Sequence, residues 1–418
     1  MLLKFRVANF RSIRDEHELS FVAADPDEGT AWPTGVVAGG KEISLLSVVG
    51  IFGANASGKS NVLQAVLAMR SAVVDSVAEW ARLDGIPREP FALDPAARGE
   101  TTLFEVDVLL GPRRVRYTYG FELSDERVEA EWLHAYPEGH KQVWFDREAD
   151  REDGDDFRFP NSNLREGKRL TELTRPNALL LTVGASFNHK QLGEVHRWFL
   201  KDLRLVTSDR DVRSRSAHTR DRLIDGRYRE QIEALLVAAD LGIVGLAIDS
   251  SLPREKRVRL LHRTRAGAPV PLDFLSQESL GTHAWFAFLG PALDVLASGS
   301  VLLADELDAS LHPLLAAEVI GMFQDLEANP NRAQLLFTTH DATLLGTAAA
   351  GRPLGREQVR VTAKKATGET ELYPLTDAHP RRDENLERGY LRGRYGGVPR
   401  VMTGEVAREV AQLRAADE

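Results

Sequence analysis

The sequence predicts an α/β protein in which a mixed or largely parallel sheet with flanking helices is joined to an antiparallel β subdomain and a helical insertion. Three observations support this fold class. Apolar, β-branched runs end in polar clusters near residues 45–52, 300–306 and 334–341, as in strands buried on both faces of a parallel sheet. Residues 101–145 alternate between apolar and polar side chains, as in an antiparallel meander. Residues 170–240 change to helical spacing.

Composition limits the class of protein before any motif is considered. The length of 418 residues suggests two or three domains. The absence of cysteine excludes disulfides and thiolate metal sites. No apolar run reaches the ~20 residues that span a bilayer, and the first residues lack the pattern of a secretory signal. We therefore expect a cytoplasmic protein.

Charge does not indicate a general nucleic-acid binder, because the formal net charge is −9. The distribution is uneven, with arginine-rich segments at 201–229 and 352–400. Solvated surface is the favoured interpretation of both segments. A patch for nucleic acid or for an acidic partner is the alternative.

The N-terminal region predicts two strands and a loop. Residues 2–8 and 18–22 alternate like strands, and residues 9–13 connect them. Residues 24–43 are rich in Gly, Pro and Asp and are predicted to form a loop. The buried run at 45–52 then leads into the first motif.

That motif is a phosphate-binding loop followed by a helix to about residue 80. It fits G-x-x-x-x-G-K-[ST], and its residues are Gly53, Ala54, Asn55, Ala56, Ser57, Gly58, Lys59 and Ser60. The glycines let backbone N–H groups approach phosphates, and the helix that follows directs its N-terminus at the anion. Lys59 would contact the β- and γ-phosphates of ATP, and the Ser60 hydroxyl would ligate Mg²⁺. We expect the next residue, Asn61, to contribute to the same nucleotide site.

The middle of the chain predicts the β meander, a loop and the helical insertion. The meander at 101–145 is expected to pack beside the P-loop strand. Residues 146–168 are acidic and have little to bury, which favours an exposed loop. Three apolar stripes then predict helices, and strands are expected at 244–248 and 258–262. The stripes are Leu173, Leu179, Leu180 and Val183; Val195, Trp198, Phe199 and Leu203; and Ile232, Leu235, Leu236 and Ala239.

Two later strands end in groups that suit ATP hydrolysis. Asp305 and Glu306 follow the run at 300–304, which would bring them beside the P-loop at the carboxyl edge of the sheet. Asp305 could hold Mg²⁺ through water opposite Ser60, and Glu306 could activate the attacking water. His340 follows the third run and could reach the γ-phosphate or orient the water and Glu306. A purely structural strand end is the alternative for each group.

These motifs resemble those of ABC-type ATPases of the SMC, Rad50, RecF and OLD group. Asp305-Glu306 resembles the Walker B motif with its catalytic glutamate. Residues 307–313, which include Asp308, resemble the D-loop. Residues 338–340 resemble the segment that ends in the switch histidine, here His340. Residues 276–282 are similar to the LSGGQ signature: Ser279 and Gly281 match, whereas Leu280 and Thr282 replace the first Gly and the closing Gln. The resemblance implies that Ser279 and Gly281 cap the γ-phosphate bound by a second subunit. An N-cap without this role is the alternative.

A narrower resemblance is to the AAA15 family of bacterial ATPases, which includes RloA and AbiLii-like abortive-infection proteins. It depends on the N-terminal residues 3–13 and on the tail residues 390–399. The resemblance implies that Arg11 contacts the nucleotide. It also implies an ATP-dependent homodimer or higher oligomer that controls an effector protein, possibly a nuclease, in defence against phage.

We expect four segments: an N-terminal ATPase lobe at 1–145, an acidic loop and helical insertion at 146–243, a C-terminal ATPase lobe at 244–350, and a basic tail at 351–418. The tail could cap the ATPase core or dock the effector. The main alternative function is a RecF-like repair clamp that binds DNA directly. A self-contained nuclease and a small-molecule P-loop kinase are weaker alternatives.

Overall fold

A six-stranded sheet forms the centre of the molecule. The computed structural model describes residues 1–25, 30–152, 154–160, 164–207, 211–239, 241–265, 267–309, 311–347 and 353–398, together with Gly404 and Arg408. Five strands of the central sheet are parallel, and the last, at one edge, is antiparallel to its neighbour. In spatial order the strands are β11 (Leu203–Thr207), β15 (Val301–Asp305), β16 (Gln334–Thr339), β5 (Val48–Gly53), β17 (Val359–Lys364) and β18 (Thr370–Pro374).

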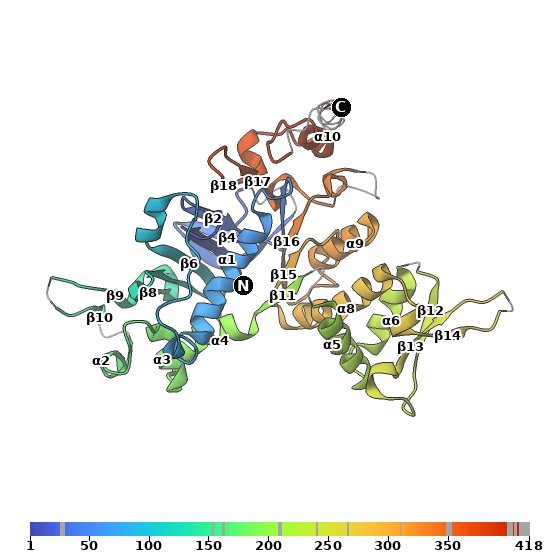
Figure 1. Ribbon diagram of the computed structural model, residues 1–418, viewed down its shortest axis with the longest axis horizontal. Helices are drawn as coiled ribbons and strands as arrows, with labels where there is room; N and C mark the ends of the chain where they lie inside the picture. Colours follow the sequence, from blue (N-terminus) through green and yellow to red (C-terminus); the bar gives the residue numbers. More distant parts are fainter. Residues whose placement is uncertain are drawn as a thin grey trace, which may run out of the picture.

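A second sheet is antiparallel throughout and forms one arm of the molecule, on the left in Figure 1. Its order is β10 (Phe157–Arg158), β9 (Gln142–Glu148), β8 (Val128–Tyr136), β7 (Val115–Leu123), β6 (Thr102–Leu110), β1 (Leu2–Ala8) and β2 (His17–Ser20). The predicted meander is therefore confirmed. The meander does not pair with the P-loop strand, whose neighbours are β16 and β17, but buried residues of both belong to one apolar cluster.

The helix that follows β5 packs between the two sheets. Helix α1 (Lys59–Asp75) buries Val62 and Leu63 in one apolar cluster with residues of the seven-stranded sheet. Alternate residues of β5 face opposite ways: Ile51 belongs to this cluster, whereas Phe52 belongs to a second cluster on the other face of the central sheet. Burial on both faces explains why the run at 45–52 is continuously apolar.

The second arm, on the right in Figure 1, carries a small three-stranded sheet and helices. Its strands are β12 (Ile243–Ile248), β13 (Val258–His262) and β14 (Val270–Asp273), and its helices include α5 (Val212–Ile224), α6 (Arg229–Ala238) and α7 (Phe274–Gln277). Helix α8 (Leu280–Ser298) packs against α5 and also against β15. Helices α9 (Pro313–Gln324) and α10 (Leu386–Leu391) complete the second apolar cluster.

The predicted helical insertion is not one unit. Helices α2 (Gly167–Thr171), α3 (Leu180–Ser186) and α4 (Lys190–Lys201) belong to the first arm, whereas α5 and α6 belong to the second. Between them, β11 joins the central sheet beside β15, so the prediction of helix over that stretch is wrong. Leu173 was assigned to a buried stripe, but 48% of it is exposed because it follows the end of α2.

Two predicted loops contain strands. Within 24–43, β3 (Ala31–Ala38) pairs with β4 (Lys41–Leu46), and Gly39 and Gly40 adopt positive φ in the two-residue turn. Pro33 lies opposite Ser44 in this ladder and is tolerated because both strands of a two-stranded sheet are edge strands. Within 146–168, β10 pairs with the end of β9.

The tail segment at 351–418 contributes directly to the central sheet. Strand β17 lies beside the P-loop strand, and β18 follows it at the edge. Most residues after 398 lie outside the described part of the chain. Among the described residues, no helix is long and apolar enough to cross a membrane. The predicted α/β class, with a largely parallel central sheet that carries the P-loop and an antiparallel β subdomain, is confirmed.

Candidate active site

The P-loop connects β5 to α1 and places Lys59 in a buried position. The Lys59 ammonium donates hydrogen bonds to the carbonyl oxygens of Gly53 (2.8 Å) and Ala54 (3.0 Å). Gly58 precedes the helix with φ of 102°, a conformation that favours glycine. No side chain caps the first N–H groups of α1 in the described structure. These groups are therefore available to an anion.

Three carboxylates surround the Lys59 ammonium. Burial lowers the pKa of Lys59 from 10.5, and the negative charges of Asp308, Glu306 and Asp305 oppose that change. A bound triphosphate would add further negative charge next to the ammonium. Phosphate binding should therefore favour the protonated form of this lysine.

ATP binding should consequently take up protons at alkaline pH. As the pH rises through the lowered pKa, free protein loses the Lys59 proton that the phosphates require, so ATP affinity should fall. Calorimetric titration with ATP in two buffers of different ionisation enthalpy measures this uptake. Lys59→Arg is the control, because its guanidinium stays charged. Equal proton uptake by both proteins would assign the effect to another group.

The predicted Mg²⁺-binding pair comes together in the structure. The Ser60 hydroxyl donates to Asp305 Oδ1 at 3.0 Å, although the two residues are 245 positions apart. Mg²⁺ prefers oxygen ligands and usually takes few from the protein, completing its shell with water and substrate phosphates. Accordingly, a hydroxyl and a carboxylate beside the P-loop fit this ion. Among the described residues, no group of three or more His, Asp or Glu side chains could hold a metal.

Glu306 and His340 lie at the ends of neighbouring strands. Glu306 has a positive φ of 53°, an uncommon conformation for a residue with a side chain. Its backbone N–H donates to the Thr338 hydroxyl at 2.7 Å. His340 Nε2 lies 3.2 Å from Asp308 Oδ2, and about half of the imidazole side chain is exposed. The structure thus pairs the predicted switch histidine with the predicted D-loop aspartate.

Hydroxyl groups from three distant segments form hydrogen bonds with or near the P-loop. We call the set of Ser12, Ser57, Thr362 and Thr370 the hydroxyl clasp. Ser57 Oγ and Thr362 Oγ1 lie 2.7 Å apart, and the Thr370 hydroxyl donates to the Ser57 carbonyl oxygen at 3.0 Å. Thr370 Oγ1 also lies 2.7 Å from Ser12 Oγ, which accepts a hydrogen bond from Asn61 Nδ2 at 2.6 Å. The clasp joins the P-loop to β17, β18 and the turn after β1.

The clasp gives the two P-loop glycines a second role. A Cβ atom at Gly53 would lie 2.2 Å from the Thr362 hydroxyl oxygen, and one at Gly58 would lie 2.0 Å from the Thr370 hydroxyl oxygen. Neither approach is compatible with a side chain. The glycines thus admit the clasp on one side of the loop as well as phosphates on the other.

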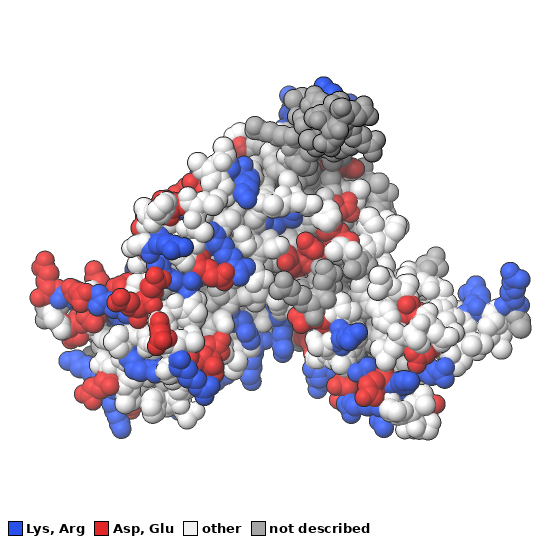
Figure 2. All heavy atoms as spheres, viewed as in Figure 1, with Lys and Arg blue, Asp and Glu red and all other residues white. Residues whose placement is uncertain are grey.

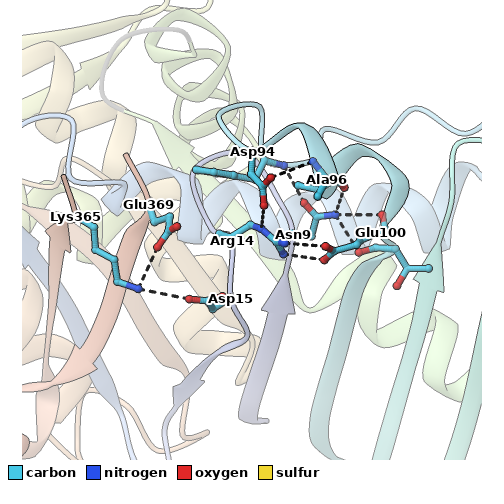
Figure 3. Close-up of polar contacts among 11 residues, drawn as sticks. Asn9, Arg14, Asp15, Asp94, Ala96, Glu100, Lys365 and Glu369 are labelled. Atoms are coloured by element: carbon cyan, nitrogen blue, oxygen red, sulfur yellow. Dashed lines mark hydrogen bonds and ion pairs between the residues drawn. The ribbon is translucent and has the colours of Figure 1, made fainter. Parts of the chain in front are cut away.

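The turn after β1 is itself anchored on two sides, as Figure 3 shows. Arg14 pairs with Asp94 (2.9 Å) and Glu100 (2.7 Å) on one side, and Lys365 lies 3.4 Å from Asp15 on the other. Ion pairs on both sides restrict this turn, which carries Ser12. The clasp therefore depends on a fixed N-terminal turn.

Arg11 and Asn61 were expected to contact the nucleotide, but the structure gives their side chains other partners. Arg11 forms a two-pronged interaction with the Glu89 carboxylate, at 2.9 Å to each oxygen. Asn61 contacts Ser12 within the clasp. In the described structure no hydrogen bond joins Arg11 to the P-loop, and the contact of Arg11 with nucleotide stays a prediction.

Removing one clasp hydroxyl should weaken nucleotide binding. We expect Thr370→Val to lower ATP affinity about three- to tenfold, because the P-loop loses a hydrogen bond worth roughly 1 kcal/mol. Equilibrium binding of a fluorescent ATP analogue measures the change. Thr182→Val is the matched control, since this buried α3 hydroxyl donates to the Val73 carbonyl at the far end of α1. An equal loss in both variants would contradict the role of the clasp.

The signature-like segment opens α8 in the second arm. The Ser279 hydroxyl accepts a hydrogen bond from the Thr282 N–H at 3.1 Å, so Ser279 is the N-cap. Gly281 lies in the first turn of the helix, and the Leu280 side chain is 86% exposed. No hydrogen bond or ion pair connects 276–282 to the P-loop within the described residues. Each chain thus presents the P-loop and the signature-like turn at separate places.

The tail residues line a pocket that reaches the P-loop. This pocket has a volume of about 810 Å³. It is lined by Ala54, Asn55 and Ser57, by residues 362–366 and Glu371 of the β17–β18 hairpin, and by residues 391–393 and 396–398. The segment whose sequence resembles the AAA15 tail therefore lies beside the P-loop.

Sequence reasoning identified the candidate catalytic residues. It did not identify the residues whose hydrogen bonds hold them in position. Thr338 was placed at a strand end, but its contacts with both Asp305 and Glu306 were not anticipated. Thr362 and Thr370 lie in the tail segment, where no motif marked a site residue. A threonine gives no pattern that would reveal contacts made across hundreds of residues.

The fold, the P-loop and the contact between Ser60 and Asp305 are those of a P-loop nucleotide-binding domain. The sequence matches a family described as "AAA domain, putative AbiEii toxin, Type IV TA system" over residues 48–346. This is most of the chain, and the chain belongs to that family. No curated protein matches the chain. Membership of the narrower AAA15 family stays a prediction.

Two solved structures are similar over most of their length. One is the Smc head domain with an extended coiled coil bound to the C-terminal domain of ScpA from Pyrococcus furiosus, with 10% identity, a TM-score of 0.40, and coverage of 90% of this chain and 97% of that chain. The other is the Smc head domain with a coiled coil and joint from Pyrococcus yayanosii, with 10% identity, a TM-score of 0.40, and coverage of 93% and 99%.

Proposed function

We propose that the protein binds and hydrolyses ATP in a Mg²⁺-dependent reaction. The observation that carries this proposal is the contact between Ser60 and Asp305 beside the buried Lys59. Lys59 and the α1 N-terminus bind the phosphates, and Mg²⁺ held near Ser60 and Asp305 would neutralise charge that develops on them. Glu306 accepts a proton from the attacking water, and His340 orients the water or the γ-phosphate.

We further propose that two chains form a homodimer when ATP binds. One chain has a P-loop and a signature-like turn at separate places, and two copies related by a two-fold axis would complete two sites. The first turn of α8, which follows Ser279 and includes Gly281, would contact the γ-phosphate on the other chain. The site is incomplete without the second copy.

The biological role that fits this chemistry is control of a separate effector by the ATP cycle, in bacterial defence of the abortive-infection type and in the cytoplasm. The family description names a putative toxin system, which agrees with that class of role. Measurement of ATP hydrolysis and of molecular mass with and without ATP·Mg²⁺ tests the enzymatic part. Absence of both hydrolysis and binding by the full chain would contradict it.

Direct contact with nucleic acid is the second candidate function. Figure 2 shows several Lys and Arg side chains around the notch between the two arms, although acidic groups are interspersed over both arms. Many arginines in the predicted basic segments are paired with carboxylates, as Arg222 is with Asp294 and Arg394 is with Glu384. DNA binding whose affinity falls steeply with salt would favour this candidate.

A further inference from the structure

A threonine on the central strand links the two carboxylates of the candidate active site. Thr338 is fully buried near the end of β16. Its hydroxyl donates to Asp305 Oδ1 at 2.6 Å and accepts from the Glu306 N–H at 2.7 Å. Its carbonyl oxygen accepts from the Leu307 N–H at 3.0 Å. One residue therefore bonds to three consecutive residues of the segment that carries the acidic groups.

These bonds begin where the regular strand pairing ends. The parallel register of β15 and β16 stops at Ala304 and Phe337. Beyond that point the chain must turn so that Glu306 takes its positive φ of 53°, a conformation that is retained only when surrounding contacts hold it. The hydroxyl of Thr338 supplies such a contact, because it accepts the Glu306 N–H in place of a hydrogen bond of the strand ladder.

The same hydroxyl also determines how Asp305 can meet a cation. Thr338 and Ser60 both donate to Oδ1 of Asp305. Two donors on one oxygen fix the plane of the carboxylate and leave the other oxygen to accept a bond from water or a metal. A carboxylate that could rotate would lose this preference.

We propose that Thr338 is a positioning residue for ATP hydrolysis, which holds Asp305 for Mg²⁺ and holds the Glu306 backbone so that its carboxylate meets the attacking water. This inference rests on the proposed ATPase function. Thr338 is fully buried, and in this proposal it acts through Asp305 and Glu306. Its contribution is to keep two functional groups in a fixed relation at the edge of the sheet.

The test compares Thr338→Ala with Thr338→Ser, because both lose the methyl group and only alanine loses the hydroxyl. We expect Thr338→Ala to reduce kcat about 10- to 100-fold, the usual effect of removing a group that orients a metal ligand. ATP affinity measured without Mg²⁺ should stay within about threefold, since Lys59 and the P-loop backbone are unchanged. The Mg²⁺ concentration that gives half of the maximal rate should rise. Thr338→Ser should restore both kcat and the Mg²⁺ requirement.

The matched controls are Thr182→Ala and Thr182→Ser, which make the same changes at a buried hydroxyl on α3. Circular dichroism and melting temperature verify that all variants fold. If Thr338→Ala and Thr338→Ser hydrolyse ATP equally well and require the same Mg²⁺ concentration, the inference is wrong although the ATPase function stands. If the wild-type protein hydrolyses no ATP, the proposed function fails first and the inference fails with it.

Discussion

Replacement of Glu306 by Gln should reduce the rate of ATP hydrolysis by about 10²- to 10⁴-fold, the range expected for loss of a general base. ATP binding should persist, because Lys59, Ser60 and Asp305 remain in place. The amide keeps the size of the side chain but cannot take the proton of the attacking water. ATP should consequently stay bound, and the proposed ATP-dependent dimer should accumulate.

Molecular mass in solution with ATP·Mg²⁺ measures this outcome for the wild type, Glu306→Gln and Lys59→Ala. Lys59→Ala is the negative control, since it removes the cation that contacts the phosphates. An ATP-dependent dimer of Glu306→Gln that Lys59→Ala cannot form would support the composite site at Ser279. If no species changes with nucleotide, the signature assignment is wrong, and a constitutive oligomer or a monomeric P-loop enzyme becomes the better interpretation.

Replacement of Glu131 by Ala should lower the free energy of unfolding by about 3–5 kcal/mol, as expected when one partner of a buried charged network is removed. Glu131 lies on β8 and is fully buried. Its carboxylate accepts the N–H groups of Leu180 (2.7 Å) and Leu181 (3.0 Å) and the Tyr119 hydroxyl (3.0 Å). Arg147 Nη1 lies 3.9 Å away. Without Glu131, the N–H groups at the start of α3 lose their buried acceptor, and the Arg147 guanidinium loses its buried counter-charge.

Denaturant unfolding followed by circular dichroism measures this loss. Glu126→Ala is the control for the first arm, because the Glu126 side chain is exposed and should change stability by less than about 0.5 kcal/mol. A small effect of Glu131→Ala would indicate that water enters and replaces the carboxylate.

The Glu131 carboxylate also predicts a pH dependence. Burial raises its pKa above 4.5, while Arg147, the two α3 N–H groups and Tyr119 act in the opposite direction. Because the folded protein holds this proton more tightly than the unfolded chain, the stability contribution falls as pH rises from about 4.5 through the raised pKa. The free energy of unfolding of Glu131→Gln should decrease less over the same pH range, because the amide does not titrate.

The candidate phosphate- and Mg²⁺-binding residues could be predicted from the sequence better than the residues that hold them in position. Buried parallel strands produce long apolar runs, and the polar residues that end them must meet at one edge of the sheet. The predicted approach of Ser60 and Asp305 is therefore confirmed. Strand β11 was missed because its five residues lie between two helices and only one edge of the strand is paired in the central sheet. The β3–β4 hairpin was missed because glycine and proline were interpreted as a loop.

The hydroxyl clasp and the Arg11 partner could not be predicted because they depend on tertiary contacts without a local pattern. Thr370 meets Ser57 across 313 positions, and Arg11 meets Glu89 across 78. Serine and threonine are common at surfaces and in turns, so their presence alone does not identify a buried bond. Only the folded arrangement distinguishes these hydroxyl groups from others.

The position of β5 has a consequence for synthesis of the protein. Both neighbours of this strand, β16 and β17, come much later in the chain, and the Thr362 hydroxyl bonds to the Phe52 carbonyl across 310 positions. While a ribosome makes the chain, the P-loop strand cannot pair until β16 and β17 have also been made. Such non-local pairing slows folding and exposes unpaired strand edges. A nascent chain that ends before β17 should therefore lack a competent nucleotide site, because β5 then has only one of its two neighbours.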